Sequence, residues 1–193
     1  MWQVRWYERD RHLRGIGDAL ETGAMSGLVG KAAVITGGAG VIGRALARHL
    51  AAAGVHVTLA DISPDRGKSI ASELDCEFIE TDVCDMHANE RMIAAAVGRF
   101  GRLDMVFLNA GVSLRGLNAE LPFDPAAIDL KAYRRILSVN IDGPVFGAAA
   151  AIPALAENGG SIVVTSSIAG LTAWPADPIY TISKHGLVGY VRS

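Results

Sequence analysis

Five short apolar runs alternate with longer stretches of helical periodicity along most of the chain. Each apolar run predicts a buried β-strand, and the runs cover residues 31–36, 55–60, 76–81, 103–108 and 161–166. The helical stretches cover residues 41–53, 64–74, 86–100, 131–156 and 178–191. Because parallel strands require long crossover connections, this alternation predicts an α/β fold, a doubly wound parallel sheet with helices on both faces.

The residues at several element ends support these boundaries. Gly54 directly follows the first helix and is suited to a C-terminal stop. Ser63 is a candidate N-cap for the second helix, and Pro64 would occupy its first position.

Residues 1–27 differ from the rest of the chain. They hold two of the three Trp residues and a dense mixture of Arg, Glu and Asp, and they show no strand pattern. We interpret them as an N-terminal extension, whether a short extra helix, an upstream translation extension or a cloning remnant. The single domain is then expected to cover residues 28–193.

Composition and charge limit the classes of function. The 193 residues carry 18 Lys and Arg against 20 Asp and Glu, a net charge of -2, and half of them are hydrophobic. This balance is typical of one soluble domain without the concentrated positive field that nucleic acids or anionic membranes require. The longest apolar run, 145–156, is too short to cross a bilayer, and the first 24 residues resemble no targeting signal. We therefore expect a cytoplasmic protein with no nucleic-acid or membrane partner.

The cysteine, histidine and serine patterns do not point to a metal site or a hydrolase. Cys76 and Cys84 have no partner at a metal-binding spacing, so we expect two reduced thiols in or near the core. Ser167 lies outside any Gly-x-Ser-x-Gly elbow. The histidines form no triad and are interpreted as structural or surface residues; they are His12, His49, His56, His87 and His185.

A glycine-rich turn joins the first predicted strand to the first predicted helix. Glycines let the backbone turn sharply and approach a pyrophosphate, which then contacts the free amides of the helix N-terminus. Tight packing is the alternative role, but the position at the first strand–helix junction favours a dinucleotide site in a Rossmann fold. The expected cofactor-binding residues of this turn are Gly37, Gly40, Val41, Ile42 and Gly43.

An acidic residue follows the second predicted strand. Asp61 lies 18 residues after Gly43, where a carboxylate can accept hydrogen bonds from the hydroxyls of adenosine ribose. Its neighbour Ile62 is expected in the same part of the site. Because the carboxylate would repel a 2′-phosphate, NAD is favoured over NADP, although the nearby cations Arg44 and Arg66 leave NADP as an alternative.

Tyr180 and Lys184 stand four residues apart in the last predicted helix, so their side chains share one face. An ammonium favours a neighbouring phenolate and lowers the pKa of the tyrosine, which suits acid/base chemistry on alcohols and carbonyls. Taken alone, such a pair is more often simply exposed on a helix surface. Ser167 adds a hydroxyl at the end of the fifth strand, where the crevice of a parallel sheet opens.

Together these motifs resemble the short-chain dehydrogenase/reductase family, and the resemblance covers about residues 28–193. Val41 stands where ordinary members usually carry a glycine, so the spacing of the turn is closer to that of the extended branch. The order and spacing of the matching pieces are highly specific; they are 36–43, Asp82-Val83, Asn109-Ala110-Gly111, Val139-Asn140, Ser166-Ser167 and Tyr180-Thr-Ile-Ser-Lys184.

The resemblance implies roles for four catalytic residues. Tyr180 would act as the acid/base, and Ser167 would hydrogen-bond the substrate oxygen. Lys184 would also hold the nicotinamide ribose. Asn140 would fix a water molecule in the proton relay, and its alternative role is to satisfy an irregular helical turn.

The resemblance also implies further contacts with the cofactor. Asp82 would meet the adenine ring, and the backbone of Val83 would meet its exocyclic amine. Asn109, Ala110 and Gly111 would form the cofactor-side loop, with Asn109 mainly stabilising the sheet. Asp82 and Asn109 could instead be simple strand-end caps.

The family resemblance leaves two hypotheses about function. Ordinary members continue through a sixth and a seventh strand, which this chain is expected to lack. The first hypothesis is an oxidoreductase that transfers a hydride between NAD(H) and a small-molecule alcohol or carbonyl substrate, and the alternative is a catalytically silent dinucleotide-binding or interaction module.

Relatives pair two helices with a second subunit, which implies a homo-oligomer, a dimer or tetramer. The loop at 112–125 either shapes the substrate pocket or packs on the surface.

Overall fold

The computed structural model describes residues 26–117, 124 and 126–193. The expected N-terminal extension therefore lies almost wholly outside the described residues. A short 3-10 helix at Ser26–Leu28 precedes the first strand. Part of the loop at 112–125 also lies outside the description.

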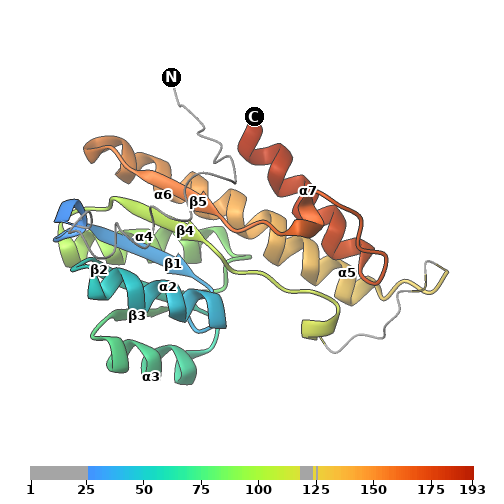
Figure 1. Ribbon diagram of the computed structural model, residues 1–193, viewed down its shortest axis with the longest axis horizontal. Coiled ribbons are helices and arrows are strands. Elements are labelled where there is room, and N and C mark those ends of the chain that lie inside the picture. Colours follow the sequence, from blue (N-terminus) through green and yellow to red (C-terminus); the bar gives the residue numbers. More distant parts are fainter. Residues whose placement is uncertain (1–25, 118–123, 125) are drawn as a thin grey trace, which may run out of the picture.

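The five predicted strands form one parallel sheet in the order β3-β2-β1-β4-β5 (Figure 1). The chain moves outward from β1 to β3 and then crosses back to β4, so the topological switch lies between β1 and β4. Ligands bind at such a switch, outside the carboxyl ends of the strands. The predicted doubly wound sheet is confirmed, with strands at Ala32–Thr36 (β1), His56–Asp61 (β2), Glu77–Glu80 (β3), Met105–Leu108 (β4) and Ser161–Val164 (β5).

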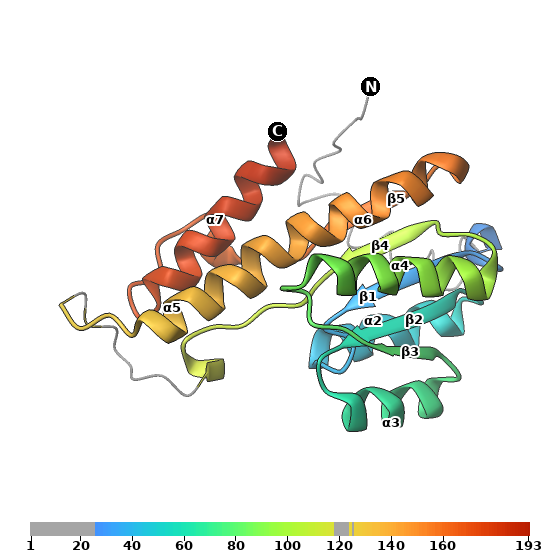
Figure 2. The same cartoon turned by 180° about the vertical axis from the view of Figure 1, so that it is seen from behind.

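Helices cover both faces of the sheet. Figure 1 shows α2 in front of the strands, and Figure 2, from behind, shows α4 and α6 in front of them. The α2 and α3 face buries a cluster that includes Ile35, Leu50 and Leu59, whereas the α4 and α6 face buries Met92 and Leu155 in a second cluster. The helices are α2 (Val41–Ala52), α3 (Pro64–Leu74), α4 (Met86–Phe100), α5 (Leu130–Leu137), α6 (Gly143–Asn158) and α7 (Pro178–Arg192).

The single helix expected at 131–156 is interrupted by a π-helix at Ser138–Asp142, between α5 and α6. An α-helix would require the backbone N–H of residue 144 to bond the carbonyl of Asn140. Pro144 has no N–H, and Gly143 N instead donates to Ser138 O in the wider π pattern. Asn140 therefore sits where the helix is locally widened.

Ser63 occupies the N-cap position of α3, but its side chain makes no capping hydrogen bond. Its backbone N–H donates to Asp61 Oδ1 at 3.0 Å. The predicted position is right, and the predicted side-chain cap is wrong because Asp61 organises this turn instead.

The continuous helical path Leu130–Glu157 is long and apolar enough to cross a membrane by length and composition alone. In the structure this path packs against α4, β4 and β5. Such packing is also what a core helix of a doubly wound sheet requires.

Asp104 fixes the amino-terminal edge of β1 and β4, at the opposite end of the strands from their carboxyl ends. The side chain is only 5% exposed, and its oxygens accept from Ala32 N, Lys31 Nζ and both Nε and Nη2 of Arg102, at 2.6 to 2.9 Å. These hydrogen bonds, that to Arg102 first, hold the pKa of the Asp104 carboxyl well below its usual value.

We expect Asp104→Asn to lower the free energy of unfolding by about 2–3 kcal/mol at neutral pH. One carboxylate oxygen, a buried acceptor, would be replaced by an NH2 group, which would face the N–H groups of Ala32, Lys31 and Arg102 that now donate to it. A folded pKa below the unfolded value stabilises the fold above about pH 4, and this contribution is lost as the pH falls further. The wild-type advantage over the variant should therefore shrink in acid. Urea unfolding at several pH values measures this difference in the free energy of unfolding, with Asp65→Asn, at an exposed position, as the control. Equal free energies of unfolding for wild type and Asp104→Asn at neutral pH would contradict the role assigned to Asp104.

Candidate active site

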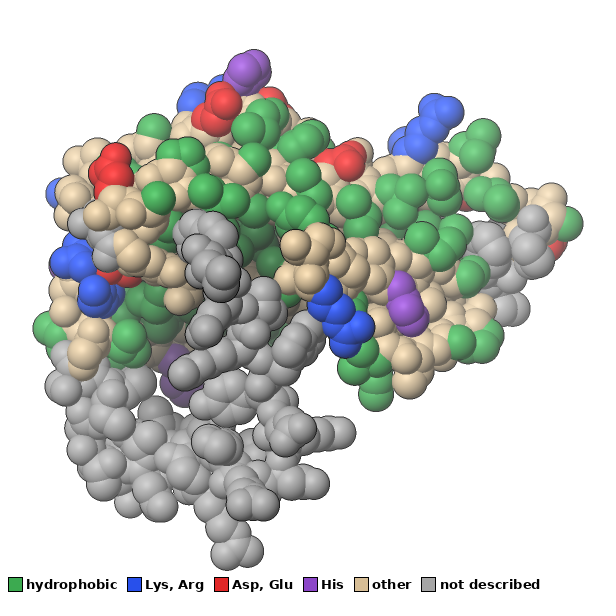
Figure 3. Space-filling view, turned by 90° about the horizontal axis from the view of Figure 1, so that it is seen from above, with side chains coloured by type: hydrophobic (Ala, Val, Ile, Leu, Met, Phe, Trp, Pro, Cys, Tyr) green, Lys and Arg blue, Asp and Glu red, His purple; other side chains and the backbone are tan. Residues whose placement is uncertain are grey.

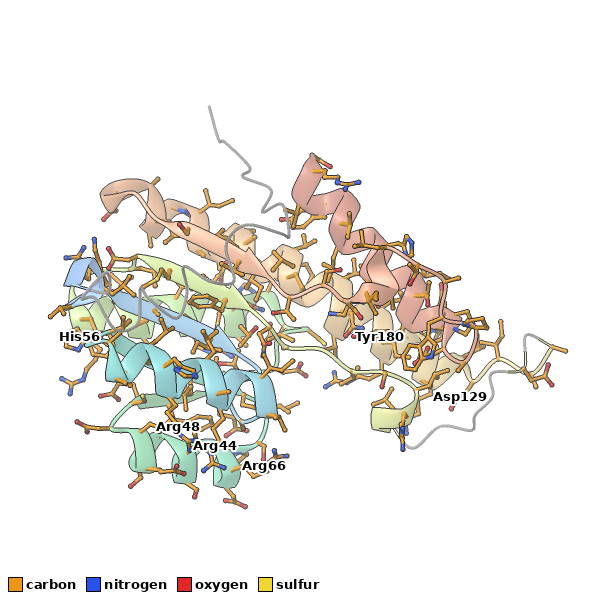
Figure 4. All side chains as sticks on the ribbon, in the orientation of Figure 1. Arg44, Arg48, His56, Arg66, Asp129 and Tyr180 are labelled. Atoms are coloured by element: carbon orange, nitrogen blue, oxygen red, sulfur yellow. The ribbon has the colours of Figure 1, made fainter. Side chains whose placement is uncertain are left out.

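A cavity of about 1140 Å³ opens along the carboxyl ends of the strands. Segments that follow all five strands line it, together with α7. Arg66 and Tyr180, labelled in Figure 4, mark its two ends, one on α3 and one on α7. The expected site residues in its lining are Gly37, Gly40, Val41, Ile42, Asp61, Ile62, Asp82, Val83, Asn109, Ala110, Gly111, Ser167, Tyr180 and Lys184.

The glycine turn is shaped by close backbone contacts. Gly37 has a positive φ of 66°, and a Cβ there would lie 2.9 Å from Ala110 Cα. A Cβ on Gly43 would overlap the carbonyl oxygen of Gly37. Gly43 does not line the cavity, so its contribution is to let α2 start directly against the turn. The exposed first residues of α2, Val41 and Ile42, then face the cavity.

Asp61 joins the end of β2 to the glycine turn. Its Oδ2 accepts from Ala39 N at 2.9 Å, and its Oδ1 accepts from Ser63 N. Each carboxylate oxygen has a further lone pair for a ligand hydroxyl. Arg66 lines the cavity and donates to Ala39 O at 2.8 Å, whereas Arg44 pairs with Glu73 of α3 and lies outside the lining.

Asp82 and Val83 form the cavity wall after β3. Asp82 Oδ1 accepts from Cys84 N at 3.0 Å, and Oδ2 lies 3.6 Å from Arg135 Nη1. Partial burial raises the pKa of the Asp82 carboxyl, but the Cys84 and Arg135 contacts outweigh it, so the net shift is downward.

The two cysteines are free and half-buried, and burial raises the pKa of the Cys84 thiol to about 11.

Asn109 connects the ends of three strands. Its Nδ2 donates to Thr36 O at 3.1 Å, and its Oδ1 accepts from Thr165 Oγ1 at 3.2 Å. The Thr36 hydroxyl in turn accepts the backbone N–H groups of Asn109 and Ala110. These bonds fit the expected sheet-stabilising role and place the Ala110–Gly111 backbone beside the glycine turn.

Asn140 is fully buried behind the cavity rather than in its lining. Its carboxamide bonds both backbone groups of Val112, accepting at 2.8 Å and donating at 2.9 Å, and donates to Ser183 Oγ at 2.9 Å. The side chain therefore ties the loop after β4 to α7. A relay water at Asn140 stays a prediction.

Two neighbouring serines after β5 have different partners. Ser166 Oγ donates to the backbone carbonyl of Lys184 and so fixes α7 against the strand end. Ser167 Oγ accepts from Ala169 N, which leaves its own proton for an oxygen in the cavity. Ser167 thus has the geometry of a donor to a bound substrate.

Lys184 is 2% exposed and lines the cavity from α7. Its Nζ donates to Thr165 O at 2.8 Å and lies 5.6 Å from the centre of the Tyr180 ring. Burial lowers the pKa of the Lys184 ammonium to about 8, so the group keeps its charge at neutral pH. A cation and a phenol thus share one wall of the cavity, as their four-residue spacing predicted.

Asp177 positions the first turn of α7, which carries Tyr180, and was not singled out from the sequence. It is 1% exposed; Oδ1 accepts from Tyr180 N at 2.9 Å, capping α7, and Oδ2 accepts from Leu114 N at 2.8 Å. An acidic residue directly before a helix-starting proline is a recognisable cap signal. Arg135, Thr165 and Trp174 also line the cavity, but no sequence pattern distinguishes them.

Comparison with known proteins assigns the family. The family described as short chain dehydrogenase matches residues 31–193. The chain therefore belongs to the short-chain dehydrogenase/reductase family, whose members are oxidoreductases. The family expected from the resemblance and the predicted fold are confirmed.

Relatives of assigned function match most of this chain. Momilactone A synthase of Oryza sativa subsp. japonica is 40% identical over 172 residues, covering 86% of this chain and 60% of that protein. Trans-4-hydroxycyclohexanecarboxylate dehydrogenase of Sinomonas cyclohexanicum is 33% identical over 174 residues, covering 84% and 64%. The chain thus spans less than two thirds of the length of either relative.

A solved structure shows the same fold. It is a short-chain dehydrogenase/reductase from Burkholderia phymatum in complex with NAD, 31% identical in sequence with a TM-score of 0.76. The match covers 84% of this chain and 58% of that chain.

Proposed function

We propose that this chain is an NAD-dependent oxidoreductase that interconverts an alcohol and a carbonyl compound, with Tyr180 as the acid/base. The carrying observation is that Tyr180, Lys184 and Ser167 line one end of a cavity whose other end is formed by the glycine turn and Asp61. The proposed NAD(P)-binding domain is residues 28–193.

The residues of the cavity fit a dinucleotide. The N-cap residue of α2, Gly40, makes no side-chain capping hydrogen bond, so the start of α2 at Val41 and Ile42 is open toward the cavity and can bind a pyrophosphate. Asp61 offers lone pairs to ribose hydroxyls, and Asp82 and Val83 lie where adenine would bind. Asn109, Ala110 and Gly111 would hold the nicotinamide side. The NAD complex of the Burkholderia phymatum relative supports the same choice of cofactor.

When bound, NAD supplies the hydride acceptor for alcohol oxidation. Tyr180 Oη would exchange the proton of the substrate hydroxyl as the alcohol is oxidised. The Lys184 ammonium, 5.6 Å from the centre of the Tyr180 ring, supplies a positive charge beside the group that handles this proton. Ser167 donates its hydroxyl proton in a hydrogen bond to the substrate oxygen and so orients it.

The test is a pair of measurements on the intact chain. NADH binding is titrated by fluorescence, and NAD reduction is followed with a panel of secondary alcohols. Binding with turnover supports the proposal. NADH binding without turnover of any alcohol would instead support the alternative of a silent dinucleotide-binding module, and absence of NADH binding would contradict both.

We expect NADH to bind more tightly than NADPH, and Asp61→Ala to narrow the ratio of the two dissociation constants by about tenfold. The carboxylate accepts from ribose hydroxyls and repels a 2′-phosphate, and each effect is of the order of 1 kcal/mol at a partly exposed site. Titrations of both cofactors measure the ratio, with the exposed Asp65→Ala as control. An unchanged ratio in Asp61→Ala would remove the ribose role from this residue.

Self-association and a cytoplasmic location stay predictions of the sequence. Exposed hydrophobic side chains of α6 and α7 include Ile152, Ile182 and Tyr190. Figure 3 shows that hydrophobic side chains are widespread on the face seen from above. Apolar surface of this kind supports packing of a second copy.

A further inference from the structure

Trp174 stands in the connection between β5 and α7, six residues before Tyr180. It lines the same cavity as Ser167 and Tyr180, and 41% of it is exposed. Its ring meets the Tyr180 ring edge to face, with the centroids 5.8 Å apart and an interplanar angle of 85°. A large aromatic surface therefore lies beside the proposed acid/base, uncovered by the rest of the described chain.

The position of Trp174 is fixed by the first turn of α7. Its backbone N–H donates to Thr181 Oγ1 at 3.3 Å, and its carbonyl accepts from Asp177 N at 3.1 Å. Thr181 Oγ1 also donates to Asp177 O. Because Tyr180 lies in the same turn, the two aromatic rings are held relative to one another by α7 itself.

The cavity has different chemistry at its two ends. Among the described lining residues, Asp61, Arg66 and Asp82 lie toward the end formed by α3 and the segments after β2 and β3, and Arg135 extends from α5 to within 3.6 Å of Asp82. At the Tyr180 end the charged lining residue is Lys184, and its ammonium is directed to Thr165 O. The neighbours of Trp174 there include the exposed Ile168 and Ala173. This end combines hydroxyl side chains, Ser167 and Tyr180 among them, with an apolar wall.

We propose that Trp174 determines substrate specificity by packing against the ring of a cyclic secondary alcohol or ketone whose oxygen contacts Ser167 and Tyr180. A ring has a preformed apolar face that can pack on the aromatic surface of Trp174 as a whole. An open chain of equal carbon number must lose several bond rotations to cover the same surface, which costs binding free energy. This inference rests on the proposed function and adds the substrate class. The relative named for trans-4-hydroxycyclohexanecarboxylate acts on such a ring alcohol by its name.

The kinetic test compares cyclohexanol with 3-hexanol, which have the same carbon number. The wild-type chain should favour cyclohexanol in kcat/KM by about tenfold, and Trp174→Ala should remove most of this preference through KM, with 3-hexanol changed by less than about threefold. Trp174→Phe should retain most of the preference. The matched control is Leu171→Ala, because Leu171 is 66% exposed in the same connection and does not line the cavity.

A binding measurement keeps the two proposals separable. Cyclohexanol is titrated by calorimetry into the NADH-bound chain, a pair that cannot react. Trp174→Ala should weaken this binding by about tenfold, and Leu171→Ala should leave it unchanged. Ring binding that depends on Trp174 without any turnover would support this inference and overturn the proposed function. Turnover without a ring preference, or ring binding that is insensitive to Trp174→Ala, would overturn this inference and leave the function intact.

Discussion

Tyr180→Phe is expected to lower the rate of alcohol oxidation by about 10²–10⁴-fold and to leave NADH binding within about twofold of wild type. The substitution removes one oxygen, the proposed proton acceptor, and keeps the ring. The edge-to-face contact with Trp174 and the position near Lys184 should therefore persist. Steady-state NAD reduction and an NADH titration on the same preparation measure the two quantities.

Tyr190→Phe provides the matched control for this prediction. Tyr190 lies on the same helix, is 40% exposed and does not line the cavity, so its loss of an oxygen should leave turnover unchanged. Substantial turnover in Tyr180→Phe would mean that another group accepts the proton, and it would remove Tyr180 from the acid/base role.

Gly43→Ala is expected to weaken NADH binding by at least about 30-fold and to lower the free energy of unfolding by about 1–3 kcal/mol. The added methyl group would overlap the Gly37 carbonyl and approach Gly38 Cα to 2.9 Å. Relief requires the turn to move, yet Gly38 is already packed on Leu59 and Gly37 on Ala110. A shifted turn would misplace the backbone that faces the pyrophosphate.

Gly98→Ala is the control for a glycine-to-alanine change in a helix. Gly98 lies in α4, and a Cβ there would have nothing within 4 Å. Its replacement should raise the free energy of unfolding by about 0.5–1 kcal/mol and leave NADH affinity unchanged. Chemical unfolding and NADH titration measure both variants, and wild-type affinity in Gly43→Ala would contradict the proposed role of the turn.

The sequence predicted those parts of the molecule that depend on local pattern. Buried parallel strands are apolar throughout, so β1 and β2 differ from their predicted ranges by no more than one residue at either end. The position of the glycine turn and the shared helix face of Tyr180 and Lys184 also follow from spacing, because each lies within a single junction or helix. These local features were enough to place one wall of the cavity and its proposed reactive group.

Features that depend on contacts across the fold were not predictable in the same way. The sequence predicted a single helix through 131–156, and the effect of Pro144 on the helix register became evident only with the backbone. Arg135 reaches the cavity because its side chain contacts Asp82 and Cys84 in the segment after β3, and Trp174 reaches it through a connection without any periodicity. Long side chains and irregular loops are placed by tertiary packing, which no pattern of neighbouring residues encodes.

The π-helix at Ser138–Asp142 makes the spacing of this segment intolerant of single-residue changes. A one-residue deletion there would restore ordinary helical winding with α5 and α6 still facing the same way, because the π-turn accommodates one residue more than an α-turn. The widened turn from which the amide of Asn140 reaches Val112 and Ser183 would then be lost. Among homologues that differ by insertions and deletions, this segment should therefore keep its length of five residues even where the residues themselves differ.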